Sequence, residues 1–265
     1  MKNTVRQALK DRVPTFGSWI QFGHTGIAEI LAQAGFAWLV IDLEHTVIGI
    51  DTVQPLIQVI ELSGSCPLVR LSANDPVQAK RVLDAGAHGV IVPAVNSGEE
   101  ARRAVAAVRY PPQGTRGVGL ARAQGYGARF AEYLDEADAY SIAIPMIEHR
   151  DAVEDIDAIV RTPGVDGIFV GPYDLSASYG VAGQMDHPLM RDAMARILKA
   201  AHAAGISPGL HVVQPPVSQV ADRIAEGFRF IAYGTDMLFL LHQAQRAVEE
   251  IRSMCRLDGG GAPCP

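Results

Sequence analysis

Short apolar segments alternate with longer amphipathic segments along almost the whole chain. The apolar segments are typical of buried strands, and in each segment that follows, apolar residues recur at helical spacing. Strands are expected at residues 15–21, 38–44, 66–72, 89–95, 141–149, 165–171, 206–213 and 228–234. Helices are expected at residues 24–35, 50–64, 75–86, 97–110, 150–164, 187–205, 216–228 and 235–252. Continuous apolar strands separated by helices indicate a parallel sheet covered on both faces.

The number of strand–helix units decides between two parallel architectures. About eight units in a chain of 265 residues match a (β/α)8 barrel, which typically takes about 250 residues. We therefore predict an α/β fold, a (β/α)8 TIM barrel, with a doubly wound open sheet as the alternative. No shift in composition marks a domain boundary, so residues 1–256 are predicted to form one barrel domain. Residues 257–265, LDGGGAPCP, are predicted to be a flexible C-terminal tail.

Charge and apolar content argue against two classes of partner. The formal net charge is −6 at pH 7, and the arginines are scattered without a basic block, which argues against a nucleic-acid surface. No apolar run approaches the ~20 residues of a membrane span, and the N-terminal segment lacks the apolar core of a secretion signal. Cys66, Cys255 and Cys264 have no CxxC spacing and are interpreted as reduced thiols. We therefore predict a cytoplasmic protein without nucleic-acid or membrane partners.

Polar side chains follow several of the predicted strands at the point where each strand ends. Because the catalytic groups of a (β/α)8 barrel lie at the carboxyl ends of its strands, these residues are candidates for an active site. Asp42, Glu44 and His45 follow the second strand, and the two acids share one side of it because they lie two residues apart. The later strands end near Arg70, Glu148, His149, Asp174, His211 and Asp236.

Each of these residues also has an ordinary structural interpretation. A buried acid, a loop histidine or a structural ion pair would explain Asp42, His45 and Arg70 one at a time. Asp174 could cap a short turn of helix. The structural interpretation prevails for four residues, which are His24, His149, His211 and Asp236. The joint pattern at the other strand ends favours an active site.

The residue types at these strand ends suit a metal-assisted reaction on a 2-oxo acid. Glu148 and Asp174 come from neighbouring strands, and Mg²⁺ or Mn²⁺ commonly takes one or two carboxylates plus water and substrate. Such a cation would polarise the keto oxygen, and Arg70 could place a fixed positive charge on the same oxygen. His45, oriented by Asp42, is then the predicted general base.

The segment GPYDLSA, which follows the sixth strand, is expected to bind the substrate carboxylate. Its backbone N–H groups would lie at the N-terminus of a helix, where anions are favoured. The predicted substrate-binding residues are therefore Arg70, Gly171, Pro172, Tyr173 and Asp174.

Four longer segments resemble the HpcH/HpaI aldolase family. They are VIDLEHTVIGIDTVQPLI, VRLSANDPVQAKRVLDAGAHGVIVPAVNS, IPMIEHRDAVEDIDAI and GVDGIFVGPYDLSASYG. The resemblance runs from about Gly17 into the last predicted helix. It implies a (β/α)8 barrel of the phosphoenolpyruvate/pyruvate superfamily type with a divalent cation, Mg²⁺, Mn²⁺ or Co²⁺. It also implies a class II aldolase that acts on pyruvate or hydroxypyruvate and an aldehyde.

The resemblance assigns roles to individual residues. It implies that His45 is the base, that Asp42 orients it and that Arg70 stabilises the enolate. It places the metal ligands at Glu148 and Asp174. The implied reaction is the cleavage of a 4-hydroxy-2-oxo acid or its reverse, which makes the protein a carbon–carbon lyase. The family further implies a homohexamer, built as a trimer of dimers, in which the last helix is exchanged between partners.

Some features depart from the family pattern or leave the aldehyde open. Met146 stands where some members have a glutamine that contacts substrate, so the pocket should be less polar at that point. The end of the seventh strand, GLHVVQPP with His211, matches no member of known specificity. Arg116, Arg122 and Arg129 lie in a long loop and could bind an acidic aldehyde, or belong to a solvated loop or a subunit contact.

Two other functions remain open. A related lyase or decarboxylase, of the oxaloacetate or acyl-CoA lyase type, would use the same metal-enolate chemistry. A non-catalytic barrel could bind 2-oxo acids for regulation, although such a protein has little need for a base at His45. Consumption of pyruvate that depends on an aldehyde distinguishes an aldolase from both.

Overall fold

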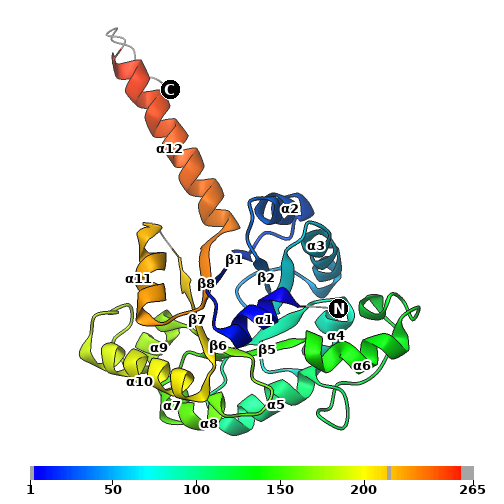
Figure 1. The fold of residues 1–265 in the computed structure, drawn as a ribbon. Helices are drawn as coiled ribbons and strands as arrows, with labels where there is room; N and C mark the ends of the chain where they lie inside the picture. The colour runs from blue at the N-terminus through cyan, green and yellow to red at the C-terminus, as the bar shows by residue number, and fades with distance from the viewer. Residues whose placement is uncertain (1–2, 214–215, 258–265) are drawn as a thin grey trace.

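The computed structural model of the protein describes residues 3–213 and 216–257. In this part of the chain, eight parallel strands close into a barrel in chain order, because β1 pairs with β8 as well as with β2 (Figure 1). The strands are β1 (Thr15–Ile20), β2 (Trp38–Asp42), β3 (Cys66–Arg70), β4 (Gly89–Val92), β5 (Ile142–Ile147), β6 (Gly167–Val170), β7 (Ser207–Val212) and β8 (Phe230–Thr235). The predicted (β/α)8 barrel is confirmed, and the pairing of the first and last strands excludes an open sheet.

Helices surround the barrel between successive strands. Asp75 accepts a hydrogen bond from the N–H of Val77, and Pro76 occupies the first position of the helix that follows, as predicted. After β1 the helices are α2 (Thr25–Gln33), α3 (Ile50–Leu62), α4 (Pro76–Asp84), α5 (Gly98–Val108), the 3-10 turn η1 (Arg122–Gln124), α6 (Phe130–Tyr140), α7 (Arg150–Glu154), α8 (Ile156–Val160), α9 (Pro172–Ser178), α10 (Pro188–Ala204), α11 (Ser218–Glu226) and α12 (Asp236–Leu257).

The predicted helix at residues 150–164 is wrong in one respect, because the structure has two short helices there. Asp155 separates α7 from α8 and has a non-helical conformation, with φ −101° and ψ 16°. Its carboxylate accepts a hydrogen bond of 2.7 Å from the N–H of Gly98, at the start of α5. Apolar periodicity continues across Asp155, so the sequence pattern does not reveal this contact between helices.

Large aromatic side chains fill the inside of the barrel. Trp38 and Phe230 stack with their ring centroids 4.0 Å apart, and Phe169 packs edge-on against Phe230. Gly17 leaves space for Trp38, because a Cβ on Gly17 would lie 2.0 Å from the indole ring. Side chains from the strands therefore occupy the interior of the barrel, as is usual for eight strands.

The helix α1 (Thr4–Asp11), which the sequence patterns do not predict, closes the N-terminal end of the barrel. Val5 and Leu9 belong to the interior cluster and are 2% and 1% exposed. The hydroxyl of Ser207, at the start of β7, donates a hydrogen bond of 2.6 Å to the carbonyl oxygen of Leu9. With this end closed, a ligand reaches the barrel from the carboxyl ends of the strands.

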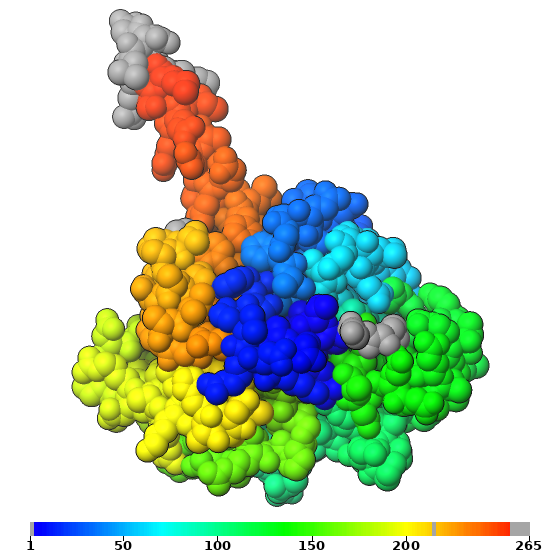
Figure 2. All heavy atoms as spheres, viewed as in Figure 1, coloured from blue at the N-terminus to red at the C-terminus, as the bar shows by residue number. Residues whose placement is uncertain are grey.

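The last helix, α12, runs out from the barrel instead of lying along it (Figure 1). Figure 2 shows it as an arm that extends beyond the compact body of the molecule. Leu240 and Leu241 are 62% and 50% exposed. Neither α12 nor any other described helix combines the length and the hydropathy that crossing a membrane requires. Of the predicted tail at residues 257–265, Leu257 ends α12 and the remainder lies outside the described residues.

Candidate active site

The carboxyl ends of β2 and β3 bring Asp42 and Arg70 together, because these two residues are partners in the sheet register. Arg70 Nε donates to Asp42 Oδ1 at 2.9 Å, and Arg70 Nη2 donates to Asp42 Oδ2 at 2.7 Å. The Asp42 side chain is fully buried and the Arg70 side chain is 11% exposed. Burial raises the pKa of Asp42, but Arg70 and two backbone donors outweigh it and hold that pKa below its ordinary value. The result is a charged, bidentate and rigid pair.

The orientation of His45 by Asp42 takes a different form from the one predicted. In the part of the chain that the structure describes, Asp42 makes no hydrogen bond to the imidazole ring of His45. Asp42 Oδ1 instead accepts from the backbone N–H groups of Glu44, at 3.0 Å, and His45, at 3.3 Å. His45 Nε2 lies 3.6 Å from Glu44 Oε2, and its side chain is 61% exposed. Asp42 therefore fixes the turn that carries His45, and Glu44 is the carboxylate beside the ring.

Arg70 has two further partners, Glu44 and Trp19, and the sequence patterns do not single out the second. Arg70 Nη1 lies 3.2 Å from Glu44 Oε2, so both acids of the second strand end reach this arginine. Arg70 Cζ lies 4.4 Å from the centre of the Trp19 ring, a cation–π contact with β1. These contacts hold the guanidinium group in one position at the mouth of the barrel.

Glu148 follows β5 and is held by the loop after β4. Its Oε1 accepts a hydrogen bond of 2.6 Å from the backbone N–H of Ala94, which has the left-handed conformation, with φ 52°. For a residue other than glycine this conformation costs on the order of 1 kcal/mol, and such strain is concentrated at functional sites. Burial raises the pKa of Glu148, the Ala94 N–H lowers it in part, and the charge of Asp174 raises it further.

The segment after β6 brings the predicted substrate-binding residues to the same rim. Gly171 is the N-cap of α9 and Pro172 is its first residue, so Asp174 lies in the first turn and does not cap the helix. The N–H groups of a first helical turn have no acceptor within the helix. Pro172 has no N–H, so the donors available to a substrate from this turn are the N–H groups of Tyr173 and Asp174.

Glu148 and Asp174 fit an oxygen-preferring divalent cation, with Glu44 nearby. Burial raises the pKa of Glu44, and the charge of Glu148 adds to that increase. Among the described residues, Glu44 Oε2 is buried and has the ion pair with Arg70 but no hydrogen bond. No group of three or more His, Cys, Asp or Glu side chains in this part of the chain is arranged to hold a metal. A cation held by two carboxylates, with water and substrate completing its shell, is the arrangement that Mg²⁺ and Mn²⁺ commonly adopt.

A cavity of about 150 Å³ opens between these elements at the carboxyl ends of the strands. Arg70, at the end of β3, and Asp174, in the helix after β6, both line it. Glu148 borders the same space, because its Oε2 lies 3.0 Å from the position of a Cβ on Gly171. The remaining lining residues are Trp19, Gln21, Met146, Phe169, Val170, Gly171, Pro172, Tyr173, His211 and Val213.

The sequence profile of the HpcH/HpaI aldolase/citrate lyase family matches residues 15–243. The chain belongs to this family. A 4-hydroxy-2-oxo-heptane-1,7-dioate aldolase from Salmonella arizonae is 40% identical over 262 residues, which cover 98% of each chain. An HpcH/HpaI family structure from Burkholderia cenocepacia has a TM-score of 0.90 at 36% identity, covering 95% of this chain and 100% of that one. An HpcH/HpaI aldolase structure from Desulfitobacterium hafniense has a TM-score of 0.85 at 28% identity, covering 94% and 96%. The predicted family resemblance is confirmed.

The cavity of this HpcH/HpaI family member contains two side chains whose roles the sequence leaves open. Met146 is 3% exposed and lines the cavity with apolar atoms and a thioether. His211, for which the sequence suggested only a structural role, also lines the cavity. His211 Nε2 donates a hydrogen bond of 2.8 Å to the carbonyl oxygen of Gly234, and burial lowers the pKa of His211 to about 4. The ring is therefore neutral at physiological pH, with Nδ1 as an acceptor.

The long loop before β5 contributes no residue to the lining of the active-site cavity in its own chain. Arg116 is buried and forms an ion pair of 2.7 Å with Asp84. Arg122 forms an ion pair with Glu61, which lies near the end of α3 and therefore at the opposite end of the barrel. The suggestion that these arginines bind an acidic aldehyde is wrong for a single chain, because Arg116 and Arg122 are engaged elsewhere. Arg129 lines a separate cavity.

Three other polar residues near strand ends have structural roles, as predicted. His24 and His149 accept hydrogen bonds from backbone N–H groups two residues further on and cap α2 and α7. Asp236 accepts hydrogen bonds of 2.8 Å from the N–H groups of Phe22 and Met237. It thus joins the end of β1 to the start of α12, of which it is the first residue, while the hydroxyl of Thr235 accepts the capping hydrogen bond of 3.2 Å from the N–H of Leu238.

Replacement of Gly171 with alanine is expected to displace Glu148 and to lower kcat at least about tenfold, since a misplacement of about 1 Å can cost about 10²-fold in rate. The added Cβ would lie 3.0 Å from both Cβ and Oε2 of Glu148. The φ of Gly171 is −101°, which any residue adopts, so the effect is steric. Steady-state kinetics measure the change in kcat, and Tm reports any loss of stability. Gly119→Ala is the control, because a Cβ at Gly119 meets open space. Native turnover in Gly171→Ala would show that this contact does not set the position of Glu148.

Proposed function

We propose that this protein is a divalent-cation-dependent aldolase. It joins C3 of pyruvate or hydroxypyruvate to the carbonyl carbon of an aldehyde, or cleaves the corresponding 4-hydroxy-2-oxo acid. The carbon–carbon lyase activity agrees with the relative of 40% identity, which is a 4-hydroxy-2-oxo-heptane-1,7-dioate aldolase. The observation that carries the proposal is the grouping of Arg70, Glu148 and Asp174 around one cavity. His45 stands at the same rim, with its Nε2 3.6 Å from Glu44 Oε2.

The chain's own groups would hold a 2-oxo acid at both of its polar ends. The guanidinium of Arg70 faces the cavity and would donate to the keto oxygen, where negative charge develops. The N–H groups of Tyr173 and Asp174 would donate to the carboxylate at the start of α9. A divalent cation, with Glu148 and Asp174 as its protein ligands, would supply Lewis acidity at the keto oxygen.

His45 would move the proton at C3. In the direction of synthesis the imidazole takes a proton from C3, and the electron pair of that C–H bond shifts toward C2 and the keto oxygen. C3 then forms a bond to the aldehyde carbon, and the aldehyde oxygen takes up a proton. In cleavage the C4 hydroxyl loses its proton, the C3–C4 bond breaks, and C3 regains a proton. The exposed side chain of His45 can exchange its proton with solvent between turnovers.

Turnover is expected to require a divalent cation and to proceed without a lysine Schiff base. The chain has four lysines, and three of them lie in the described residues on helices, Lys10 on α1, Lys80 on α4 and Lys199 on α10. Lys2, the fourth, precedes the first strand. A Schiff-base lysine must meet the substrate carbonyl and have a lowered pKa. EDTA should therefore abolish the aldehyde-dependent consumption of pyruvate, and Mg²⁺, Mn²⁺ or Co²⁺ should restore it.

A trapping experiment separates the two mechanisms directly. Sodium borohydride added with pyruvate should leave the mass of the intact protein unchanged. Covalent trapping of pyruvate on a lysine, or full activity after complete removal of metal, would contradict the proposed mechanism.

The protein is also proposed to form a homo-oligomer, a hexamer built as a trimer of dimers. The exposed apolar residues of α12 have no cover from their own barrel, and large apolar patches usually mark interfaces. On the barrel, Phe16 of β1 is 40% exposed and the nearby Phe22 is 37% exposed. The α12 of a second chain would cover these phenylalanines and bury its own apolar side chains. The exposed apolar residues of α12 are Met237, Leu240, Leu241, Val248, Ile251 and Met254.

Light scattering at micromolar concentration is expected to give a mass several times that of one chain, 28.4 kDa. The double variant Leu240→Glu, Leu241→Glu places two charges in the apolar stretch of α12 and should shift the mass toward smaller species. Both leucines are exposed within the single chain, so the substitution leaves the barrel core unchanged. A sharp monomer mass for the unaltered protein would contradict the assembly.

A further inference from the structure

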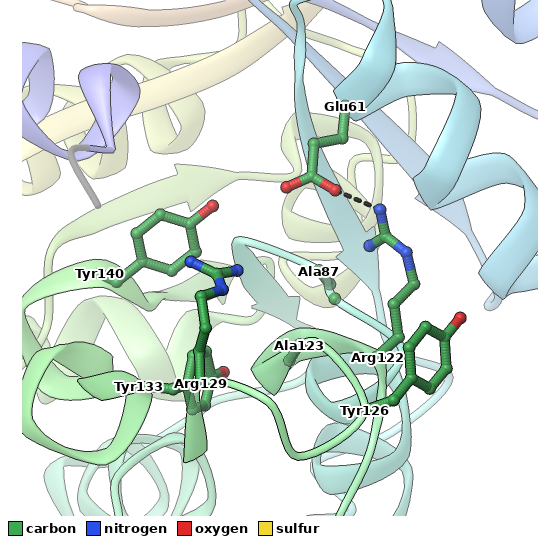
Figure 3. Close-up of a pocket in the computed structure, with 9 residues that line it drawn as sticks. Glu61, Ala87, Arg122, Ala123, Tyr126, Arg129, Tyr133 and Tyr140 are labelled. Carbon is green, nitrogen blue, oxygen red and sulfur yellow. Dashed lines mark hydrogen bonds and ion pairs between the residues drawn. The ribbon is translucent and has the colours of Figure 1, made fainter. Parts of the chain in front are cut away.

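A second cavity, of about 220 Å³, lies at the end of the barrel opposite the candidate active site. It is formed between the last turn of α3, the turn that precedes β4, the η1 segment and α6 (Figure 3). Gly86 and Ala87 precede β4, and Tyr140 precedes β5, which places the cavity beside the amino ends of these strands. No residue that lines it belongs to the candidate active site.

Aromatic rings and small side chains make up much of the wall. Tyr133 and Tyr140 are 3% and 7% exposed, and Tyr126 is 69% exposed. The hydroxyl of Tyr133 accepts a hydrogen bond of 3.3 Å from Arg116 Nη1, and the hydroxyl of Tyr140 is hydrogen bonded to His88 Nε2. Because both inner hydroxyl groups are engaged in the wall, these tyrosines present ring surface to the cavity.

The charges in the cavity do not balance. Glu61 and Arg122 form an ion pair, shown as the dashed line in Figure 3, and neutralise each other. A hydrogen bond with His88 and the charge of Arg122 lower the pKa of Glu61 to about 2, so this carboxylate stays ionised. Arg129 also lines the cavity, and its guanidinium points toward the side where Tyr140 lies. No hydrogen bond or ion pair joins the Arg129 side chain to any other residue within the described part of the chain. One positive charge is therefore left over.

We propose that this cavity binds a small aromatic carboxylate. Arg129 is positioned to pair with the carboxylate, for which its planar fork of donors is suited. The rings of Tyr126, Tyr133 and Tyr140 provide the surface for an aromatic body, which prefers offset or edge-on packing against other rings. The volume is below the ~300–1,000 Å³ of pockets for drug-sized ligands, so the ligand has the size of a single-ring metabolite.

The proposal is independent of the aldolase reaction, and binding can be measured without turnover. Isothermal titration and the rise in Tm of the full-length protein both report a ligand that binds the folded state. Benzoate is the probe, and acetate and inorganic phosphate are compared with it at equal ionic strength. Benzoate should bind saturably and at least about tenfold more tightly than acetate or phosphate, since ring packing adds to the ion pair.

Arg129→Gln is the deciding variant, because it removes the free charge and keeps a side chain of similar length. It should weaken benzoate binding at least about tenfold, as expected for the loss of a charge-assisted hydrogen bond. Arg161→Gln is the matched control, because Arg161 is 69% exposed outside this cavity and should leave binding unchanged. Tyr126→Asn removes a rim ring at a left-handed position, φ 56°, which asparagine tolerates, and should also weaken binding.

Competition with pyruvate distinguishes binding in this cavity from binding in the candidate active site. A saturating concentration of pyruvate with Mg²⁺ should not displace benzoate, because the two cavities share no residue. The proposal is overturned if benzoate does not bind saturably, if pyruvate displaces it, or if Arg129→Gln binds it as well as the unaltered protein does. Binding of acetate or phosphate as tight as that of benzoate would overturn the aromatic class of the ligand.

Discussion

Replacement of Arg70 with alanine is expected to destabilise the protein by about 3–5 kcal/mol at neutral pH, the usual cost of removing one partner of a buried ion pair. Asp42 has no exposed surface and depends on Arg70 for both of its strong hydrogen bonds. Without the guanidinium group, a carboxylate would remain buried without a counter-charge. Urea unfolding followed by far-UV circular dichroism measures the change in the free energy of unfolding.

The double variant Asp42→Asn, Arg70→Ala is the matched control, because it removes the stranded charge as well as the cation. It should be more stable than Arg70→Ala alone. If the single and double variants unfold at the same urea concentration, the buried charge of Asp42 is not the cause of the loss.

The pH dependence of the Arg70→Ala variant follows from the same pair. In the native protein the pKa of Asp42 is held below its ordinary value, so the stability from the pair is present above the unfolded pKa and is lost as pH falls through the folded pKa. Without Arg70, burial dominates and the folded pKa rises above the unfolded one. The destabilisation should therefore shrink as pH is lowered from 7 toward 5, because Asp42 becomes protonated. A pH-independent loss would contradict the charge argument.

Arg70→Lys should keep much of the stability of the native protein and little of its turnover. Lysine retains one positive charge for Asp42. It lacks the planar fork with which arginine contacts Asp42 and at the same time presents donors to the cavity. Near-native kcat in Arg70→Lys would show that a diffuse positive charge is sufficient at this position.

Replacement of His45 with alanine is expected to lower kcat by a factor of about 10²–10⁴, the usual contribution of a general acid–base group. The His45 side chain is 61% exposed, so the free energy of unfolding should change little. Binding of the divalent cation should persist, because the proposed ligands are Glu148 and Asp174. Steady-state kinetics and titration with Mn²⁺ measure the two quantities separately.

His149→Ala is the matched control for this variant. His149 is a second histidine at a strand end, 40% exposed, and it caps α7 through the N–H of Asp151. Its replacement should cost some stability through the lost cap, typically about 1 kcal/mol, and leave kcat within a few-fold. Loss of cation binding with retained proton transfer in His45→Ala would mean that His45 is a ligand and not the base.

The fold could be predicted from the sequence because each strand of the barrel is buried on both faces. This burial makes the strands nearly continuous apolar runs. The rule that catalytic groups of such barrels follow the strands singled out Asp42, Arg70 and Glu148 as candidates without a structure. The helix α1 precedes the first strand and therefore lies outside the alternation of strands and helices. Its signal is limited to Val5 and Leu9, four residues apart on one face.

The contacts within the site could not be predicted, because they join residues far apart in the chain. The partner of Asp42 follows from strand register, which pairs it with Arg70 and leaves His45 beside Glu44. Trp19 is 51 residues before Arg70 and reaches it across the barrel mouth. The hydrogen bond from Ala94 to Glu148 depends on a left-handed backbone conformation that a sequence rarely reveals for alanine.

The exchange of the C3 hydrogens of pyruvate with solvent tests the central claim most directly, because it reports proton removal without an aldehyde. In D2O with Mg²⁺ or Mn²⁺, proton NMR should show loss of the pyruvate methyl signal with the unaltered protein. The loss should stop after EDTA treatment and should slow by about 10²–10⁴ in His45→Ala. Exchange that continues at the native rate without metal or without His45 would contradict the proposed roles of the cation and the base. A complete absence of exchange in the unaltered protein, with metal present, would contradict the proposal that this site forms the enolate of pyruvate.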